Sequence, residues 1–309
     1  MLKDQGLVKF KEPFTRLLTQ GMVCKETMAC PEHGLLLPEE TESRDGSRLC
    51  RKCSKPIDLG RVEKMSKSKK NVIDPNLLIE KYGADTTRLF CLFAAPPERD
   101  LEWSEQGVEG GYRFLKRVWR LASSYMETIK NLAPFDGSPD KLEGEFRELF
   151  KKTHQTIRKV TKDVEERFHF NTAISAVMEL VNTMYGIETI DSSPQQAGVM
   201  RLAMESVVLL LSPVVPHFAE ELWEALGHES SVLLAAWPSY RDDALIKDEL
   251  LIVVQVNGKL RSRFNAAVDT DDNTLRETAL ADERVQKFIK DKPIKKVVVV
   301  AKKLVNIVV

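Results

Sequence analysis

A short basic segment with interspersed hydroxyl groups has the residue types best suited to phosphate chemistry. Within VEKMSKSKKNVIDP, residues 62–75, four lysines fall in seven positions and two serines lie among them. These residues are Lys64, Ser66, Lys67, Ser68, Lys69 and Lys70. Lysine is a mobile point charge, so a loop of this kind can follow the oxygens of a polyphosphate as charge develops on them. A solvated basic turn and an RNA-backbone contact have the same composition, and composition alone favours these two alternatives.

A second group of residues has the types and spacing of a metal site. Cys30-Pro-Glu-His33 and Cys50-Arg-Lys-Cys53 are two ligand pairs with sixteen residues between them. Such pairs let tight turns direct four ligands at one Zn²⁺ ion, whereas disulfides are rare in a reducing cytosol. The intervening segment is too polar to bury a core, so a metal would supply its stability. Cys24 is an alternative ligand, and four unrelated loop residues are the alternative interpretation.

The overall composition limits the class of protein. A chain of 309 residues can form two or three domains, each with its own core. Lys plus Arg equals Asp plus Glu at 46 each, so any affinity for nucleic acid must come from local clusters. No apolar run approaches the roughly 20 residues that span a bilayer, and the N-terminal MLKDQG lacks the apolar core of a signal peptide. We therefore expect a cytoplasmic protein that does not enter a membrane.

Helices are expected directly after the lysine segment. Asp74 is a suitable N-cap with Pro75 in the first helical position, and this helix should end at Gly83. A second helix is predicted over ADTTRLFCLFAA, with Cys91 in the core. Residues 1–23 indicate a mixture of strand and helix, typical of the middle of a domain.

Residues 104–238 predict an antiparallel helical bundle. Ser104 can cap a helix in which apolar residues alternate at spacings of four and three. This stripe comprises Val108, Tyr112, Leu115, Trp119, Ala122, Met126 and Ile129. Further helices are expected in EFRELFKKTHQTIRKVTKDVEER, NTAISAVMELVNTMYGI, QQAGVMRLAMESVVLLL and PHFAEELWEAL. The four tryptophans are expected to anchor the core: Trp103, Trp119, Trp223 and Trp237.

Residues 248–309 predict a small α+β domain. ELLIVVQVNGKLRSRFNA and KKVVVVAKKLVNIVV favour strands, and a charged helical part lies between them from Thr274 to Lys290. The predicted fold class is therefore multidomain, with an α/β part, an all-α bundle and this α+β part.

Two sets of cations are candidates for RNA binding. Arg113, Lys116, Arg117 and Arg120 occupy positions i, i+3, i+4 and i+7 of the predicted helix, so they form one basic edge. In VNGKLRSRF, Lys259, Arg261 and Arg263 recur with a period of two, which predicts that all three leave one face of a strand. Each set is either solvated or lies against a polyanion.

The basic segment also contains a family signature. Lys64-Met65-Ser66-Lys67-Ser68 is the second signature of class I aminoacyl-tRNA synthetases. KMSKSKKNVIDPNLLIEKYGADTTRLFCLFAAPPERDLEWSEQGVEGGYRFLKRVWRL resembles bacterial leucyl-tRNA synthetases almost without interruption, as do PVVPHFAEELWEALG and LLIVVQVNGKLR. The resemblance covers nearly the whole chain and is weakest over residues 24–60.

The resemblance implies ATP-dependent attachment of leucine to tRNA(Leu) through leucyl-adenylate, with Mg²⁺ accompanying ATP. It implies that Lys67 meets the phosphates with Lys64 as a supporting charge, so these two lysines are the predicted catalytic residues. The segment Lys64, Met65, Ser66, Lys67 and Ser68 is the predicted ATP-binding loop. The resemblance also makes the bundle an anticodon-binding type of domain and makes tRNA the polyanion that meets the two cationic sets.

Two departures from the family pattern qualify these expectations. The His-Ile-Gly-His type signature and the editing domain are missing, so residues 1–103 are expected to form only the second part of a Rossmann-like catalytic domain. The chain should then need the N-terminal half of the synthetase, either as a separate chain or as a missing region. The Cys/His segment, residues 24–60, lies where family members often carry an insertion, and many of them lack cysteines there. The alternative function is a non-catalytic RNA-binding or zinc-binding module that retains the motif.

Overall fold

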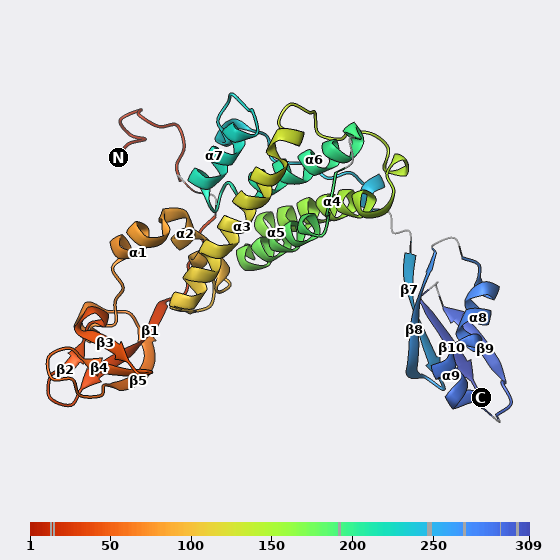
Figure 1. Ribbon diagram of the computed structural model, residues 1–309, viewed down its shortest axis with the longest axis horizontal. Coiled ribbons are helices and arrows are strands. Elements are labelled where there is room, and N and C mark those ends of the chain that lie inside the picture. The colour runs from red at the N-terminus through yellow and green to blue at the C-terminus, as the bar shows by residue number, and fades with distance from the viewer. Residues whose placement is uncertain are drawn as a thin grey trace. The chain divides into compact units, whose positions relative to one another are not determined.

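The chain forms two compact units, Met1–Ala244 and Leu245–Val309. The computed structural model, drawn in Figure 1, describes every residue except 13, 15, 191, 192, 246–248, 268, 269, 291, 301 and 302. The predicted boundary between residues 103 and 104 falls inside the first unit, so the division into three domains stays a prediction. Among the described residues, no helix combines the length and apolar character needed to cross a membrane.

Most strands of a small sheet come before the helices of the first unit in the sequence. Its central strand β1 (Val23–Cys30) pairs antiparallel with β2 (Gly34–Leu36) and β5 (Asp58–Lys64) and parallel with β6 (Leu101–Glu102). A separate hairpin is formed by β3 (Thr41–Arg44) and β4 (Ser47–Cys50). The described residues before Val23 form no helix or strand, so the mixture predicted for residues 1–23 is wrong there. Several of their apolar side chains are exposed, Leu7, Phe14 and Leu17 among them.

Local end signals place the two helices that follow the lysine segment. α1 (Pro75–Tyr82) begins as predicted, because Asp74 Oδ1 accepts a hydrogen bond of 2.9 Å from the N–H of Asn76. Gly83 ends α1 with a φ of 83°, which an L side chain rarely adopts, and α2 (Ala84–Phe93) starts directly after it. Cys91 is only partly buried beside a small core cluster, and burial raises the pKa of its thiol.

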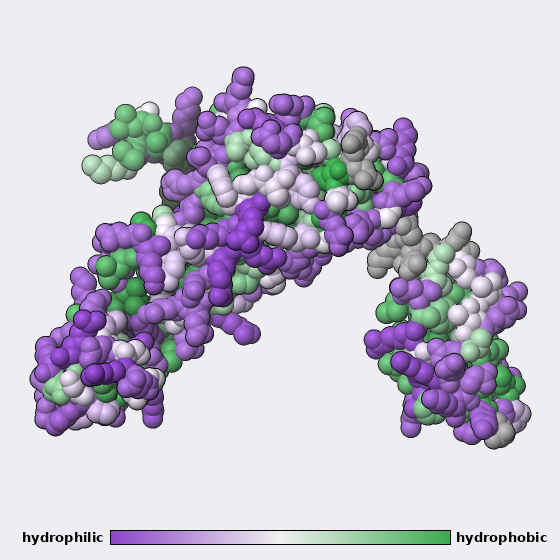
Figure 2. All heavy atoms as spheres, in the orientation of Figure 1, coloured by the Kyte–Doolittle hydropathy of each residue, from purple (hydrophilic) through white to green (hydrophobic). Residues whose placement is uncertain are grey.

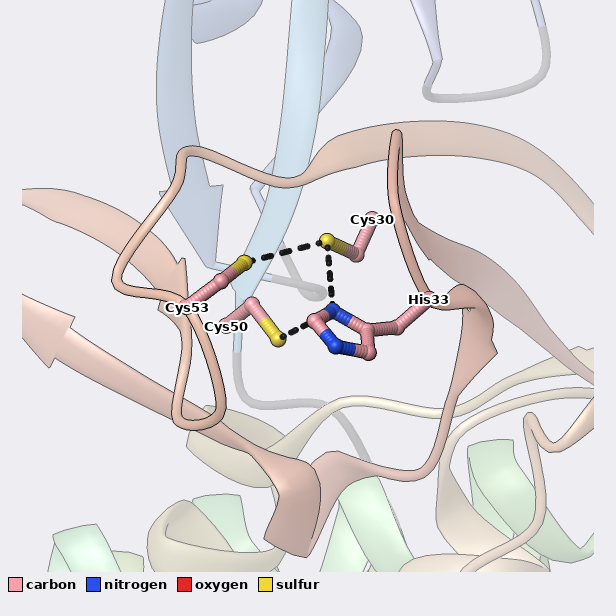
Figure 3. A group of neighbouring side chains, drawn as sticks. All are labelled: Cys30, His33, Cys50 and Cys53. Atoms are coloured by element: carbon pink, nitrogen blue, oxygen red, sulfur yellow. Dashed lines mark hydrogen bonds between the residues drawn. The ribbon is translucent and has the colours of Figure 1, made fainter.

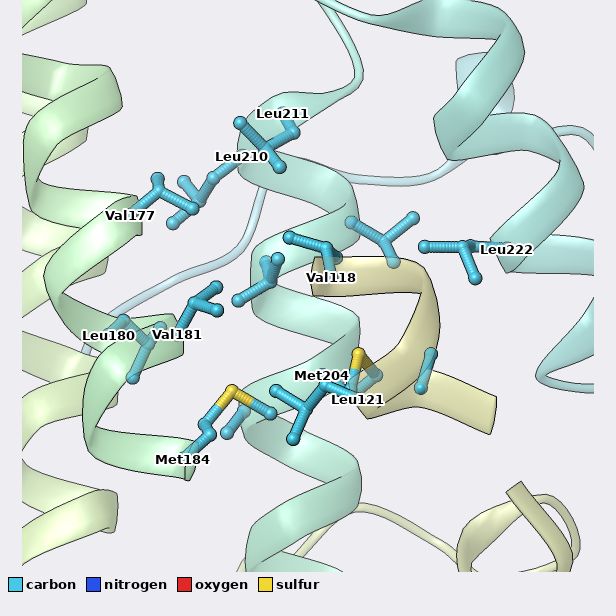
Figure 4. Close-up of a cluster of buried hydrophobic side chains, with 14 of the residues drawn as sticks. Val118, Leu121, Val177, Leu180, Val181, Met184, Met204, Leu210, Leu211 and Leu222 are labelled. Carbon is cyan, nitrogen blue, oxygen red and sulfur yellow. The ribbon is translucent and has the colours of Figure 1, made fainter. Parts of the chain in front are cut away.

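Five helices make up the bundle of the first unit. They are α3 (Glu105–Ile129), α4 (Gly144–Glu165), α5 (Phe170–Tyr185), α6 (Pro194–Leu211) and α7 (Pro216–Ala225). Ser104 caps α3 as predicted, its Oγ accepting from the N–H of Gly107 at 3.1 Å. The chain turns between α4 and α5 at Phe168, whose φ is 55°. Side chains from α3, α5, α6 and α7 interlock in one core, of which Val118, Val181, Met204 and Leu222 are labelled in Figure 4.

Two of the four tryptophans contradict the prediction that they anchor the core. Trp119 and Trp237 are each 40% exposed, whereas Trp223 is buried and Trp103 is partly buried. Trp237 instead donates from Nε1 to Thr161 Oγ1 at 2.9 Å. Tryptophan combines a large apolar body with one polar N–H, so spacing alone does not decide whether it lies inside the core or at its margin.

A buried arginine on α6 joins the C-terminal ends of two other helices. Arg201 on α6 is 4% exposed, and its Nε lies 2.6 Å from Glu205 Oε1. Its Nη1 donates to the carbonyl oxygens of Ile129, Lys130 and Leu226 at 3.2, 2.8 and 2.7 Å. These carbonyls lie at the C-terminal ends of α3 and α7, where helix geometry leaves backbone acceptors without partners. One side chain therefore satisfies both helix ends inside the bundle.

In its described residues, the second unit is a four-stranded sheet with two helices. The strand order is β8 (Lys259–Ala267), β7 (Glu249–Val256), β10 (Leu304–Val308) and β9 (Lys296–Val300), with β10 parallel to β7. The helices α8 (Asp272–Ala281) and α9 (Glu283–Ile289) pack their apolar residues on one face of this sheet. In the described residues of this unit, two strands come first, two helices follow and two strands come last.

Candidate functional site

The lysine segment forms an ordered loop after β5. Ser66 begins a short 3-10 helix, Lys67–Lys69, in which its Oγ accepts from the N–H of Lys69 at 3.2 Å. Lys70 ends this turn in the left-handed region with a φ of 52°. The serine at position 66 thus shapes the backbone that presents Lys67 to solvent.

A buried asparagine fixes this loop to the sheet. Asn71 is 0% exposed, and its Oδ1 accepts from the N–H of Ser66 at 2.9 Å. Its Nδ2 donates to the carbonyls of Lys25, Glu63 and Lys64 at 3.0, 3.2 and 3.4 Å. We did not predict this role. The sequence signal that could have indicated it is the position of this amide side chain between the basic segment and the apolar pair Val72-Ile73.

Two of the four lysines have carboxylate partners in the structure. Lys69 Nζ is paired with the Glu63 carboxylate, and Lys70 Nζ lies 3.3 Å from Glu40 Oε2. Lys64 and Lys67 are exposed, and neither has a carboxylate partner in the part of the chain that the structure describes. The two free ammonium groups are therefore the ones predicted to meet ATP.

Glu40 connects the loop with the Cys/His segment. Its Oε2 accepts from the N–H of Leu37 at 3.0 Å as well as from Lys70, and its Oε1 accepts from Lys52 at 3.0 Å. The Leu37 N–H, followed by the Lys52 and Lys70 ammonium groups, lowers the pKa of the Glu40 carboxyl to about 2. Lys52 lies between Cys50 and Cys53, so one ionised carboxylate links both features.

The predicted metal ligands converge in space. One ligand atom from each of Cys30, His33, Cys50 and Cys53 lies within 4.8 Å of every other, and Figure 3 shows their side chains pointing toward one centre. Cys30 Sγ is 3.4 Å from His33 Nδ1 and 3.5 Å from Cys53 Sγ. Cys24, the alternative ligand, is outside this group, because β1 places it opposite Lys64. Three sulfurs and one imidazole are a donor set that suits Zn²⁺.

The thiols of the cluster do not ionise alike. Burial raises the pKa of Cys30, but hydrogen bonds from His33 and the nearby backbone outweigh it and lower the value to about 6. The Lys55 N–H lowers the pKa of Cys53, but burial and the neighbouring Cys30 and Cys50 raise it to about 11. Ionisation of one thiol therefore raises the pKa of its neighbour. A bound divalent cation would relieve this repulsion between thiolates.

The predicted basic edge lies on α3. Arg113, Lys116, Arg117 and Arg120 are all exposed, and Figure 2 shows strongly hydrophilic atoms where Figure 1 places α3. Arg117 donates from Nη2 to Asn182 Oδ1 at 2.9 Å and lies over the Tyr185 ring. Arg117 therefore also ties α3 to α5.

The prediction that three tail cations share one face is wrong, because a β-bulge interrupts β8. Val254 pairs with Ser262, whereas Gln255 pairs with Leu260, which leaves Arg261 as the extra residue. A bulge of this kind shifts the alternation of side chains on one side of it by one position.

The three cations consequently have different surroundings. Lys259 pairs with Val256, which belongs to the core beneath the helices, so Lys259 lies on the helix-covered side at the hairpin end. The Arg261 guanidinium lies 3.8 Å from the ring centroid of Phe288 on α9. Arg263 remains exposed beyond the bulge.

Comparison with known proteins agrees with this geometry. Residues 58–104 match the family of class I tRNA synthetases for I, L, M and V, and residues 147–276 match the anticodon-binding domain of tRNA ligases. The leucine–tRNA ligases of Desulfatibacillum aliphaticivorans and Desulforapulum autotrophicum are 62% and 59% identical over the whole chain. A solved leucyl-tRNA synthetase from Agrobacterium radiobacter K84, in a ternary complex with tRNA and LeuAMS, is 31% identical with a TM-score of 0.71.

These matches cover nearly all of this chain but only about a third of each relative. The structural match covers 99% of this chain and 35% of the solved chain, and this chain spans 36% of the length of the two ligases. The fold and the lysine loop define part of a class I tRNA synthetase with an anticodon-binding domain. Within that class, the chain belongs to the bacterial leucine–tRNA ligases and corresponds to their C-terminal part.

Proposed function

We propose that this chain supplies the phosphate-binding loop and the tRNA-binding domains for attaching leucine to tRNA(Leu). The observation that carries the proposal is the division of the loop lysines. Lys69 and Lys70 are paired with Glu63 and Glu40, while Lys64 and Lys67 project without carboxylate partners among the described residues.

The chemistry requires positive charge beside the phosphates of ATP. The leucine carboxylate attacks the α-phosphorus of Mg²⁺-bound ATP, pyrophosphate leaves, and leucyl-adenylate forms. A hydroxyl at the 3′ end of the tRNA then attacks the leucyl carbonyl, and AMP leaves. In the first step Lys67 stabilises the charge that develops on the phosphates, with Lys64 beside it. Met65, Ser66 and Ser68 complete the ATP-binding loop, which Asn71 holds in place.

The rest of the catalytic domain is supplied by the N-terminal half of the synthetase. We propose that residues 1–103 are the second part of a Rossmann-like domain, which is completed by that half. Apolar side chains of the N-terminal segment support this, because Leu7, Phe14 and Leu17 are 68%, 79% and 89% exposed. Figure 2 shows the corresponding apolar surface beside the N-terminus. Burying it against a further part of the protein would be favourable.

The Cys/His cluster is proposed to hold one structural Zn²⁺ through Cys30, His33, Cys50 and Cys53. The small core around it, which consists of Leu36 and the cysteines with Ile57 beside them, is too limited to stabilise the segment alone. The ion would supply cross-links among the turns. Through Glu40, this segment also positions the lysine loop.

The cationic residues on α3 are proposed to contact the tRNA backbone: Arg113, Lys116, Arg117 and Arg120. In the second unit Lys259, Arg261 and Arg263 are proposed to do so individually rather than as one row. Contacts of this kind set affinity and position but do not read the base sequence.

The test is reconstitution with the N-terminal half. The chain alone should not exchange pyrophosphate with ATP in the presence of leucine, and the combined halves should. In the combined enzyme Lys67→Ala should slow adenylate formation about a hundredfold. Lys69→Ala is the matched control, since that lysine is already paired with Glu63. Failure of the combined halves to activate leucine would favour the non-catalytic RNA-binding or zinc-binding module.

A further inference from the structure

An open aromatic groove lies beside the basic edge of α3. It has a volume of about 430 Å³ and is lined mainly by apolar groups of α1, α3 and α7. The side chains that shape it are Tyr82, Tyr112, Leu115, Lys116, Trp119 and Phe218. The volume exceeds that of one planar heterocycle, so a single ring is of a size that this groove can hold.

The rings in this groove form two edge-to-face pairs. Tyr82 and Tyr112 have centroids 5.5 Å apart at an interplanar angle of 67°, and Trp119 and Phe218 are 6.0 Å apart at 62°. Edge-to-face packing uses the edge of one ring in each pair, so the pairs do not stack their faces on each other. Trp119 is 40% exposed here, whereas the other apolar residues of that stripe are buried or partly buried.

Positive charge lines the same groove. Lys116 Nζ lies 4.4 Å from the centroid of Tyr112. Arg113 and Arg120, about one turn to either side on α3, are exposed and have no ion pair in the described parts of the chain. The carboxylate of Asp85 in the groove wall is engaged, because it accepts from His217 Nδ1 at 2.9 Å and from the N–H of Phe218 at 2.7 Å.

We propose that this groove receives an unstacked nucleobase of the bound tRNA, while Arg113, Lys116 and Arg120 contact the flanking phosphates. The inference rests on the proposed function, since it names where the bundle holds the RNA. Aromatic platforms beside a cationic strip are the combination by which proteins bind bases without reading sequence. An apolar peptide would fill the groove but would leave the adjoining cations without complementary charge.

The decisive experiment compares Trp119→Ala with Trp119→Phe in the combined enzyme, using tRNA(Leu) transcript and a binding assay at two salt concentrations. Loss of one base–aromatic stack should weaken binding roughly tenfold to a hundredfold in the Ala variant, whereas Phe keeps a ring and most of the affinity. Trp237→Ala is the matched control, because Trp237 is equally exposed but is not among the residues that line the groove. It should leave tRNA affinity unchanged. Arg113→Ala and Arg120→Ala should each reduce the salt slope by about one.

A second measurement does not depend on folding of the variants. Ultraviolet crosslinking of the parent enzyme to tRNA should label the peptide that contains Tyr112 and Trp119. Equal tRNA affinity in the parent and Trp119→Ala, or absence of this crosslink, overturns the groove proposal while tRNA binding by the parent upholds the proposed function. Protection of Trp119 from oxidation by the N-terminal half alone would show that protein covers the groove, and would also overturn the proposal. A parent enzyme that binds no tRNA would overturn the proposed function itself.

Discussion

Replacing Asn71 by alanine should release the lysine loop from the sheet while the rest of the chain stays folded. Asn71 is 0% exposed and makes four hydrogen bonds, of which the shortest is 2.9 Å from the N–H of Ser66. The alanine variant leaves that N–H and the facing carbonyls without this partner. Each buried group left unpaired costs about 1–3 kcal/mol, and water reaches part of this half-exposed loop.

We therefore expect a total cost of about 2–4 kcal/mol, which corresponds to roughly a thirtyfold to a thousandfold lower population of the ordered loop. Hydrogen exchange at the backbone amides of Ser66 and Lys69 measures this population directly, and their protection should fall by a similar factor. Pyrophosphate exchange in the combined enzyme should fall in parallel, because Lys67 loses its position. Asn71→Asp should keep only the bond from Ser66, since a carboxylate does not donate.

The matched control for this prediction is Asn76→Ala, since Asn76 is exposed at the start of α1. That change should alter stability by less than about 0.5 kcal/mol. If the Ser66 amide remained equally protected in Asn71→Ala, the asparagine would not be what orders the loop, and the reasoning from its hydrogen bonds would be refuted.

Three further predictions concern other parts of the chain. Arg201→Met should lower the free energy of unfolding by about 3–5 kcal/mol in a denaturant titration, because it removes the arginine from the buried Glu205, leaving its contact with His228, and takes the donor from three carbonyls, whereas exposed Arg113→Met should have little effect. Elemental analysis should find about one zinc per chain in protein purified without chelator and much less in Cys50→Ser; a metal-free parent would contradict the site. Burial, followed by the nearby Arg241 charge, lowers the pKa of His154 to about 4, below its usual value near 6.5. The folded state therefore favours the neutral ring, and stability that is present above about pH 6.5 should be lost as pH falls toward 4, a dependence that His154→Asn should flatten.

Features specified by neighbours in the chain could be predicted from the sequence. The N-caps Asp74 and Ser104 accept from amides two and three residues onward, so the residues needed to form each cap are all present in one short segment. The grouping of Cys30, His33, Cys50 and Cys53 followed from their spacing, because each pair is already brought close by its own turn.

Features that depend on partners far away in the sequence could not be predicted from it. Trp119 is exposed because α7 supplies only an edge contact through Phe218, and helical periodicity carries no information about that neighbour. The cations of β8 were assigned to one face because the sequence alternates, but pairing with β7 inserts a bulge at Arg261. The position of a bulge is decided by the register between strands rather than by either strand alone.

The sequence by itself determined which residues are predicted to carry the chemistry of the lysine loop, since Lys64 and Lys67 lie in a five-residue signature that can be recognised without coordinates. Only the tertiary structure decided which of the loop lysines have a carboxylate partner among the described residues. Glu40 is thirty residues from Lys70 in the chain, yet its carboxylate accepts a hydrogen bond from the Lys70 ammonium group. The Asn71 amide donates to the carbonyl of Lys25, which is forty-six residues away. Ion pairs and hydrogen bonds act over a few ångströms of space, so their partners are set by how the chain folds back on itself and not by separation along it.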